Sequence, residues 1–88
     1  MSWFVYILRC NNGDLYTGIT THLERRYREH CSGKGGGFTN ANRPTELLYH
    51  ESHATESDAK RREAQIKGWS RRKKLSLISG DPKPLTRS

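Results

Sequence analysis

The chain has 88 residues, and its 16 Lys and Arg outnumber its 9 Asp and Glu, which gives a formal net charge of +7. This length is enough for one domain, because a second domain would leave neither with a hydrophobic core. The excess of cations favours a polyanionic partner such as nucleic acid. No apolar run approaches the about 20 residues needed to span a bilayer, so a membrane partner is not expected.

Two cysteines and the start of the chain bear on the compartment. Cys10 and Cys31 are too few for a disulfide framework and too few for a structural zinc site. The first residues, Met1–Trp3, contain no basic segment followed by an apolar one, so they do not resemble a secretory signal. We therefore expect a cytoplasmic protein in which both thiols are reduced and structural.

The first elements expected are two strands joined by a tight turn. Trp3–Leu8 is a short run rich in aromatic and β-branched residues, which is typical of a buried strand. Residues 11–14, with the sequence Asn-Asn-Gly-Asp, predict a turn because Gly and Asn tolerate a positive φ. Leu15–Ile19 then predicts the returning strand of a hairpin.

A helix is expected over residues 21–31, roughly. Thr20 or Thr21 can cap it, and Thr21 and Glu24 have the spacing of a capping box, in which each side chain bonds a backbone N–H group of the first turn. Helical geometry also places four residues on one stripe, namely Leu23, Tyr27, His30 and Cys31. Residues 32–42 contain four glycines and several small polar side chains, so they predict a mobile loop.

The second half of the chain predicts a third strand and two more helices. The strand is expected at Thr45–Glu51, and a helix capped by Thr55 or Ser57 is expected to end near Trp69. Another helix is expected to begin at Ser70, because an apolar patch follows the basic run after it. That helix ends where glycine and two prolines follow, within residues 80–84.

The order β-β-α-β-α-α predicts an α/β fold of the α+β kind, with a three-stranded antiparallel sheet packed against helices. We expect the domain to occupy residues 1–79 and residues 80–88 to form a disordered tail.

One carboxylate lies on the apolar stripe of the helix that precedes Trp69. Ala59, Glu63 and Ile66 are spaced i, i+4 and i+7, so Glu63 faces the sheet. It is the only acid between Ala59 and Lys74, a segment with eight Lys and Arg. Burying a carboxylate costs free energy unless the group is paired or binds a metal. Two interpretations stay open: an ion pair with a nearby Arg, or a ligand for a divalent cation in a cleft.

The hairpin and the first helix contain other polar groups with two interpretations. Arg26 lies at the edge of the buried stripe, where an arginine either extends to solvent or clamps a phosphate through two hydrogen bonds. Tyr6 and Tyr16 lie one on each hairpin strand, and Gly18 follows Tyr16 on the same sheet face. A glycine in a strand allows a close approach. A shallow site floored by Gly18 is therefore the alternative to two ordinary core tyrosines.

These residues together resemble a known family. Val5-Tyr6-Ile7, followed by Tyr16-Thr17-Gly18, resembles the paired tripeptides that name the GIY-YIG nuclease family. Residues 18–30 are similar to the family's helix with an invariant arginine and often a histidine one turn later. Residues 59–69 are similar to its second helix, which carries a metal-binding glutamate. The resemblance covers residues 3–78, approximately, and is greatest to the small stand-alone branch of short bacterial proteins (YhbQ-like).

The resemblance implies a metal-dependent endonuclease that hydrolyses DNA phosphodiester bonds, specific for DNA structure or active in DNA repair or processing. The implied site residues are Tyr6, Tyr16, Arg26, His30 and Glu63. In this family-based assignment Glu63 binds Mg²⁺ or Mn²⁺, and Arg26 clamps the scissile phosphate. One of the two tyrosines activates the attacking water, and His30 carries protons or orients a tyrosine. An unperturbed phenol titrates near about 10, so a tyrosine base needs cationic neighbours, which Arg26, Lys67 and the metal would supply.

Further cations are expected to contact the nucleic acid: Arg25, Lys34, Arg43, Lys67, Arg71, Arg72, Lys73 and Lys74. The partner is expected to be DNA, with RNA as the alternative. So small a domain carries no second module to read sequence, so specificity is expected from the shape of the substrate or from a protein partner.

Two features favour a second hypothesis. Larger family members carry an asparagine beyond the glutamate for which this chain offers no clear equivalent, and residues 35–42 carry little charge. The alternative is a non-catalytic nucleic-acid-binding module that keeps the fold; a third hypothesis is a protein-interaction adaptor. The sequence leaves open the substrate structure, the oligomeric state and the identity of the tyrosine base.

Overall fold

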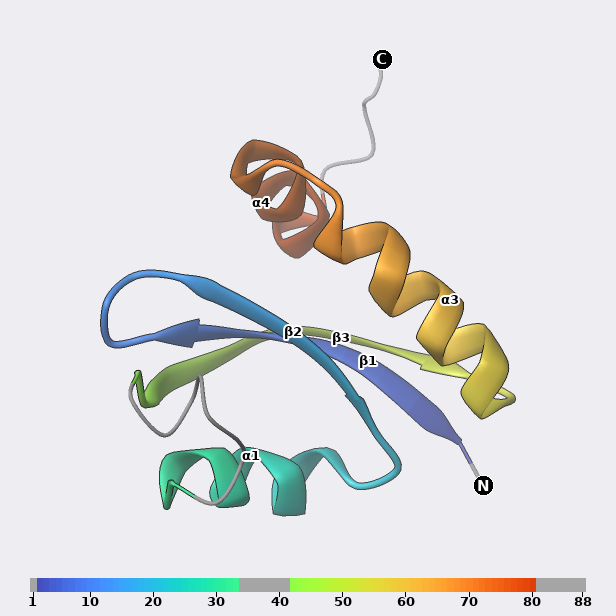
Figure 1. The fold of residues 1–88 in the computed structure, drawn as a ribbon, viewed down its shortest axis with the longest axis horizontal. Coiled ribbons are helices and arrows are strands. Elements are labelled where there is room, and N and C mark those ends of the chain that lie inside the picture. The colour runs from blue at the N-terminus through green and yellow to red at the C-terminus, as the bar shows by residue number, and fades with distance from the viewer. Residues whose placement is uncertain (1, 34–41, 81–88) are drawn as a thin grey trace.

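The computed structural model describes residues 2–33 and 42–80, and Figure 1 shows their arrangement. The elements are β1 (Trp3–Cys10), β2 (Leu15–Thr20), α1 (Leu23–Cys31), β3 (Pro44–His53), α3 (Glu56–Lys67) and α4 (Arg71–Ser79). This confirms the predicted order and fold class. The mobile loop and the disordered tail expected at residues 32–42 and 80–88 lie almost wholly outside the described residues.

The sheet has the strand order β2-β1-β3, and both pairs are antiparallel. Central strand β1 sets the register: Tyr6 lies opposite Gly18 of β2 and His50 of β3. Because successive side chains of a strand point to opposite faces, Val5 and Ile7 face one layer of helices and Tyr6 faces the other. The hairpin therefore places the two halves of the tyrosine motif on one face.

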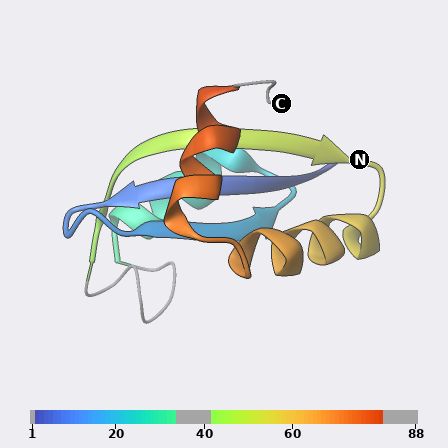
Figure 2. The same cartoon turned by 90° about the horizontal axis from the view of Figure 1, so that it is seen from above.

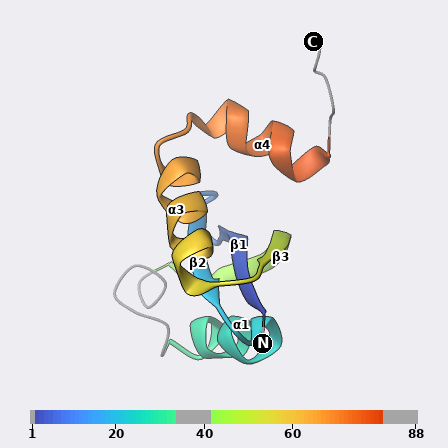
Figure 3. The same cartoon turned by 90° about the vertical axis from the view of Figure 1, so that its right-hand side faces the viewer.

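The helices cover both faces of the sheet. Figure 1 shows α1 on one side and α3 with α4 on the other, and Figure 2 shows α3 beside β2 while α4 crosses above the strands. Val5 and Ile7 pack with Ala59 and Ile66 of α3, and all four are 0% exposed. The apolar stripe predicted for α3 is therefore confirmed. Figure 3 shows the three layers edge-on, with α1 and α4 farthest apart.

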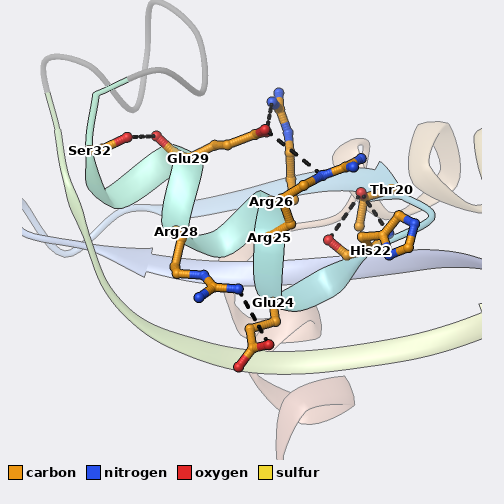
Figure 4. Close-up of polar contacts among 8 residues, drawn as sticks. All are labelled: Thr20, His22, Glu24, Arg25, Arg26, Arg28, Glu29 and Ser32. Atoms are coloured by element: carbon orange, nitrogen blue, oxygen red, sulfur yellow. Dashed lines mark hydrogen bonds and ion pairs between the residues drawn. The ribbon is translucent and has the colours of Figure 1, made fainter.

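The first turn of α1 differs from the prediction. The helix begins at Leu23 after His22, whose side chain makes no capping hydrogen bond. Instead the Thr20 Oγ1 atom accepts from the backbone N–H of His22 at 3.1 Å, as Figure 4 shows. The capping box predicted for Thr21 and Glu24 is wrong, because the turn after β2 is closed by the preceding threonine.

The ends of the later helices follow the sequence signals. Thr55 caps α3 by accepting from the backbone N–H of Asp58, and Ser70 caps α4 in the same way through Lys73. Gly80 ends α4 in the left-handed conformation at φ 71, which glycine adopts without steric cost. Among the described residues, no helix has the length and apolar character required to cross a membrane.

Candidate functional site

Strands β1 and β2 and helix α1 bring two tyrosines and a histidine together. The Tyr6 Oη atom lies 2.8 Å from Nε2 of His30, and the two residues are 2% and 0% exposed. The ring of Tyr16 meets the imidazole edge-on with 5.1 Å between ring centroids, and it lies 6.4 Å from the ring of Tyr6. Three of the residues predicted for the site therefore form one aromatic cluster on the α1 face.

Gly18 makes this cluster sterically feasible. A Cβ atom at Gly18 would lie 2.5 Å from Oη and 2.7 Å from Cζ of Tyr6, and 3.2 Å from Cε2 of Tyr16. Real side chains do not approach that closely, so any other residue would displace the rings. The groups that lie closely packed against Gly18 are thus the phenol rings of Tyr6 and Tyr16.

Arg26 extends from α1 to the same cluster. Its guanidinium forms a hydrogen bond with Tyr6 and a second one, Nη1 to Glu29 Oε1, at 3.0 Å. The side chain is 32% exposed, so solvent reaches the guanidinium from one side. Figure 4 shows Arg25 and Arg26 both directed at Glu29. Sequence reasoning gave Glu29 no role, although its i+3 spacing from Arg26 is a sufficient signal for an ion pair.

The electrostatics of the cluster fix its protonation state. Burial, together with the positive charge of Arg26, lowers the pKa of His30 to about 4, so the imidazole is neutral at neutral pH. Neutral Nε2 can then accept the Tyr6 O–H. Burial raises the pKa of Tyr6 to about 12, and although Arg26 lowers this pKa, as expected of a cation, burial outweighs it. Tyr6 is therefore a protonated donor and His30 a neutral base.

Glu63 lies in the other layer, on α3. Its side chain is 22% exposed, and its Oε2 atom is 3.3 Å from Nζ of Lys67. Its negative charge contributes to raising the pKa of Tyr6, so the carboxylate lies within electrostatic range of the phenol. The ion-pair partner is Lys67 rather than the arginine considered from the sequence.

The donor set around Glu63 fits one kind of metal site. The described residues contain no group of three or more His, Cys, Asp and Glu that could enclose an ion. Magnesium, however, is commonly held by one or two carboxylates together with waters and substrate phosphates. A partly exposed single carboxylate matches that requirement. The residues present therefore fit a divalent cation that is shared with a phosphate substrate, not one enclosed by the protein.

An acid of β3 holds α3 in place. Glu51, with 18% of its side chain exposed, accepts hydrogen bonds from Tyr49 Oη at 2.6 Å and from Arg62 Nε at 3.0 Å. Arg62 precedes Glu63 in α3, and its guanidinium also lies 5.1 Å from the ring centroid of Trp69. These contacts fix the rotation of α3 and hence the direction of Glu63. No sequence pattern predicts the pairing of Glu51 with Arg62.

The cations predicted to bind nucleic acid fall into two groups. Arg25 belongs to α1, and Arg43 contacts the C-terminal end of the same helix, because Nη1 of Arg43 donates to the Cys31 carbonyl at 2.9 Å. Lys67 and residues 71–74 lie in the layer of α3 and α4, on the opposite face of the sheet. The structure thus separates these cations, and Lys34 is outside the residues it describes.

The chain is similar to known proteins. A family model described as the GIY-YIG catalytic domain matches residues 2–76. The UPF0213 protein SERP0126 of Staphylococcus epidermidis is 45% identical over 75 residues, which are 85% of this chain and 92% of that protein. A UPF0213 protein of Bacillus pumilus is 46% identical over 71 residues, or 81% of this chain and 72% of that protein.

Two solution NMR structures are also similar. The UPF0213 protein BH0048 from Bacillus halodurans has a TM-score of 0.59 and 40% identity, with 96% of this chain and 89% of that chain covered. The protein EF2693 from E. faecalis has a TM-score of 0.63 and 35% identity, with 91% and 85% covered. Both the family model and the relatives span most of the chain, so it belongs to the GIY-YIG catalytic domain family and groups with its small UPF0213 proteins.

Proposed function

We propose that this protein is a metal-dependent endonuclease that hydrolyses phosphodiester bonds of DNA at the cluster around Tyr6 and His30. Membership of the GIY-YIG family implies the nuclease class, a nucleic-acid substrate and the use of a divalent metal ion. The observation that carries the proposal is the 2.8 Å contact between Tyr6 Oη and His30 Nε2. Arg26 interacts with the same phenol, so the neutral imidazole of His30 and the guanidinium of Arg26 meet at the Tyr6 hydroxyl.

The cation binds the phosphate. The guanidinium of Arg26 is planar and can donate two hydrogen bonds to the non-bridging oxygens of a phosphodiester. It is partly exposed and already holds a carboxylate of similar geometry, that of Glu29. Substrate would replace part of that contact, and the fixed positive charge would stabilise the negative charge that builds on the phosphate oxygens during attack.

The less buried phenol faces the attacking water. Tyr6 is almost fully enclosed and bonded to His30 and Arg26, so we assign it as a positioning residue. Tyr16 is half-buried, and its ring lies against the imidazole, so we assign it to orient the water. The water oxygen forms the new bond to phosphorus while the bond to the leaving oxygen breaks. The proton released passes through the Tyr16 hydroxyl to solvent, and the leaving oxygen takes up a proton from solvent. Neutral His30 holds Tyr6 in place by accepting from its hydroxyl.

Glu63 supplies the protein ligand for Mg²⁺ or Mn²⁺. The bound cation would contribute positive charge at the leaving oxygen. Lys67 forms an ion pair with the carboxylate, and the contacts of α3 with the sheet fix the rotation of this helix. The direction of the Glu63 side chain is therefore set before the substrate binds. We further propose that the shape of the DNA, or a protein partner, selects the cleavage position.

One observation favours a non-catalytic nucleic-acid-binding module as the second candidate. Arg26 and Glu63 are each engaged by an opposite charge of the protein itself, Glu29 and Lys67 respectively. A protein that only binds nucleic acid would not need to break either of these ion pairs.

A cleavage assay distinguishes the two candidates. Single-stranded, duplex and branched DNA would be incubated with Mg²⁺ or Mn²⁺ and the wild-type protein, Arg26→Gln or Arg25→Gln. Both arginines pair with Glu29, and Arg26 in addition interacts with Tyr6, so Arg25→Gln is the matched control. We expect Arg26→Gln to lower the cleavage rate by about 100-fold or more, as for loss of one transition-state donor. Binding of every DNA with cleavage of none would support the non-catalytic module instead.

A further inference from the structure

The positive charge of the molecule is distributed unevenly between its layers. On α1, Arg25 and Arg26 pair with Glu29, and Arg28 pairs with Glu24. On α3 every Lys and Arg also has an acidic partner. In contrast, residues 71–74 of α4 make no ion pair with any part of the chain described, and the first turn of α4 contains no acid. Among the described residues, most of the positive charge that has no acidic partner therefore lies on α4.

The side chains of α4 are partly held in place. Arg71 Nη1 donates to the carbonyl of Gly13 at 2.8 Å and so ties α4 to the turn between β1 and β2. Lys73 Nζ lies 4.5 Å from the ring centroid of Trp69. An extended cationic surface that is already ordered loses little conformational entropy when it binds an anion.

The surface beside these cations is hollowed. A hollow of about 450 Å³ is lined by Arg71, Arg72, Leu75, Ser76 and Ser79. A second one of about 270 Å³ is lined by Asp14, Leu15, Arg71 and Lys74. Guanidinium and hydroxyl groups are the donors that proteins direct at phosphate oxygens. Four adjacent cations near the positive end of a helix also repel one another and the helix dipole, and a bound polyanion would relieve that repulsion.

We infer that α4 is a docking surface for the phosphodiester backbone, separate from the Tyr6–His30 cluster, and that it supplies most of the affinity for nucleic acid. The inference rests on the proposed function for the nature of the partner only. Because α4 and α1 lie on opposite faces of the sheet, the docked segment and the segment at the cluster are different parts of one substrate (Figure 3). The substrate class is therefore a nucleic acid that is long, bent or branched enough to reach both layers.

A salt titration tests this division. The probe is a labelled duplex longer than the 40 Å long axis of the molecule, and its binding is followed by fluorescence anisotropy in EDTA, without cleavage. The double variant Arg72→Gln/Lys74→Gln removes two unpaired cations. The matched control Lys60→Gln/Arg61→Gln removes two cations of α3 that pair with Glu56 and Asp58.

We expect the α4 variant to reduce the slope of log K against log salt by about 2 and to weaken binding at low salt by about tenfold or more. The control is expected to change the slope by less than about 0.5, since each of its cations already has an acidic neighbour. Equal effects of the two variants, or none, would overturn the inference. So would binding of anionic lipid vesicles in preference to the duplex.

The outcome is separable from the nuclease proposal. If the protein cleaves, the protein concentration needed for half-maximal single-turnover cleavage should rise in the α4 variant and stay at the wild-type value in the Lys60→Gln/Arg61→Gln control. If no DNA is cleaved under any condition, the nuclease proposal fails, but the salt titration in EDTA still decides the role of α4.

Discussion

At the scale of single residues, Gly18 determines how closely the two phenols approach. We predict that Gly18→Ala lowers the free energy of unfolding by about 1–3 kcal/mol, the range typical of overpacking a well-packed site. The added methyl would meet Tyr6 Oη at 2.5 Å, so the ring must move away from His30. Urea unfolding and the near-ultraviolet spectrum of the tyrosines measure both effects.

Gly68→Ala is the matched control for Gly18→Ala. A Cβ at Gly68 would have the carbonyl oxygen of Gln65 as its nearest neighbour, at an ordinary 3.5 Å, and φ is −82. The control should leave stability unchanged or raise it slightly, because alanine restricts the unfolded chain. Equal free energies of unfolding for the two variants would contradict the prediction, because they would show that the tyrosine rings accommodate the methyl group without a loss of stability.

His30 predicts a pH dependence of stability. In the unfolded chain its pKa is about 6.5, and in the folded protein burial lowers it to about 4. As the pH falls through this interval, the unfolded state takes up a proton that the folded state refuses, so stability is lost. The shift corresponds to at most about 3 kcal/mol, complete near the lower pKa. Urea unfolding at a series of pH values measures it.

The comparison variant for this pH dependence is His30→Gln, which keeps a neutral acceptor for the Tyr6 hydroxyl. Hydrogen bonds and charges lower the pKa of Glu29 and Glu51. The contributions of these two carboxylates to stability are lost only when the pH falls below about 4.5, the ordinary pKa of a glutamate. Between pH 6.5 and 4.5, approximately, wild type should therefore lose more stability than His30→Gln. Parallel profiles would contradict a buried neutral imidazole.

At the scale of elements, α3 is positioned by contacts on both of its sides. Ala59 and Ile66 seat it on β1, and Arg62 ties it to β3 through Glu51. We predict that Arg62→Ala lowers the free energy of unfolding by about 2–3 kcal/mol, because the half-buried carboxylate of Glu51 loses its arginine and keeps only Tyr49 and His53 as partners. Chemical unfolding measures the change.

Arg61→Ala is the control for this element. Arg61 is one position away on the same helix and pairs with Asp58 at 3.0 Å, but both side chains are largely exposed. Its loss is expected to cost less than about 0.5 kcal/mol. A similar cost for the two variants would mean that Glu51 and Arg62 do not hold α3.

Much of the element level follows from local sequence signals. An apolar run rich in aromatic and β-branched residues and the turn residues after it predicted the hairpin, and the hairpin register alone places Tyr6 opposite Gly18. Start signals at Thr55 and Ser70 predicted two helices correctly. The capping box predicted for Thr21 and Glu24 is absent, because the backbone N–H of His22 donates to the hydroxyl of Thr20. The pair of Glu51 with Arg62 was beyond prediction, since it depends on how α3 is rotated over the sheet.

At the scale of the whole molecule, the Tyr6–His30 cluster and the excess positive charge are separated because the helices that carry them cover opposite faces of the sheet (Figure 1). Helical spacing predicted that Arg26 and His30 share one side of α1, and the structure adds that this side meets Tyr6. It could not predict that α3 and α4 cover the opposite face, because an amphipathic stripe fits either face of a sheet equally well. The side of a helix that two residues share could therefore be predicted from the sequence, but the layer to which each helix belongs could not.

The central claim is that Glu63 acts with the Tyr6–His30 cluster in one reaction. The most direct test is the single-turnover cleavage rate of DNA with Mn²⁺, at saturating protein, for wild type and Glu63→Gln. Glu46→Gln, an exposed acid of β3 that pairs with Arg9, is the control for the loss of one carboxylate.

We predict that Glu63→Gln lowers the cleavage rate by at least about 100-fold, the loss typical of one group that stabilises transition-state charge. DNA binding in EDTA should stay at the wild-type level, and Glu46→Gln should cleave at the wild-type rate. Cleavage by Glu63→Gln at the wild-type rate would contradict the claim.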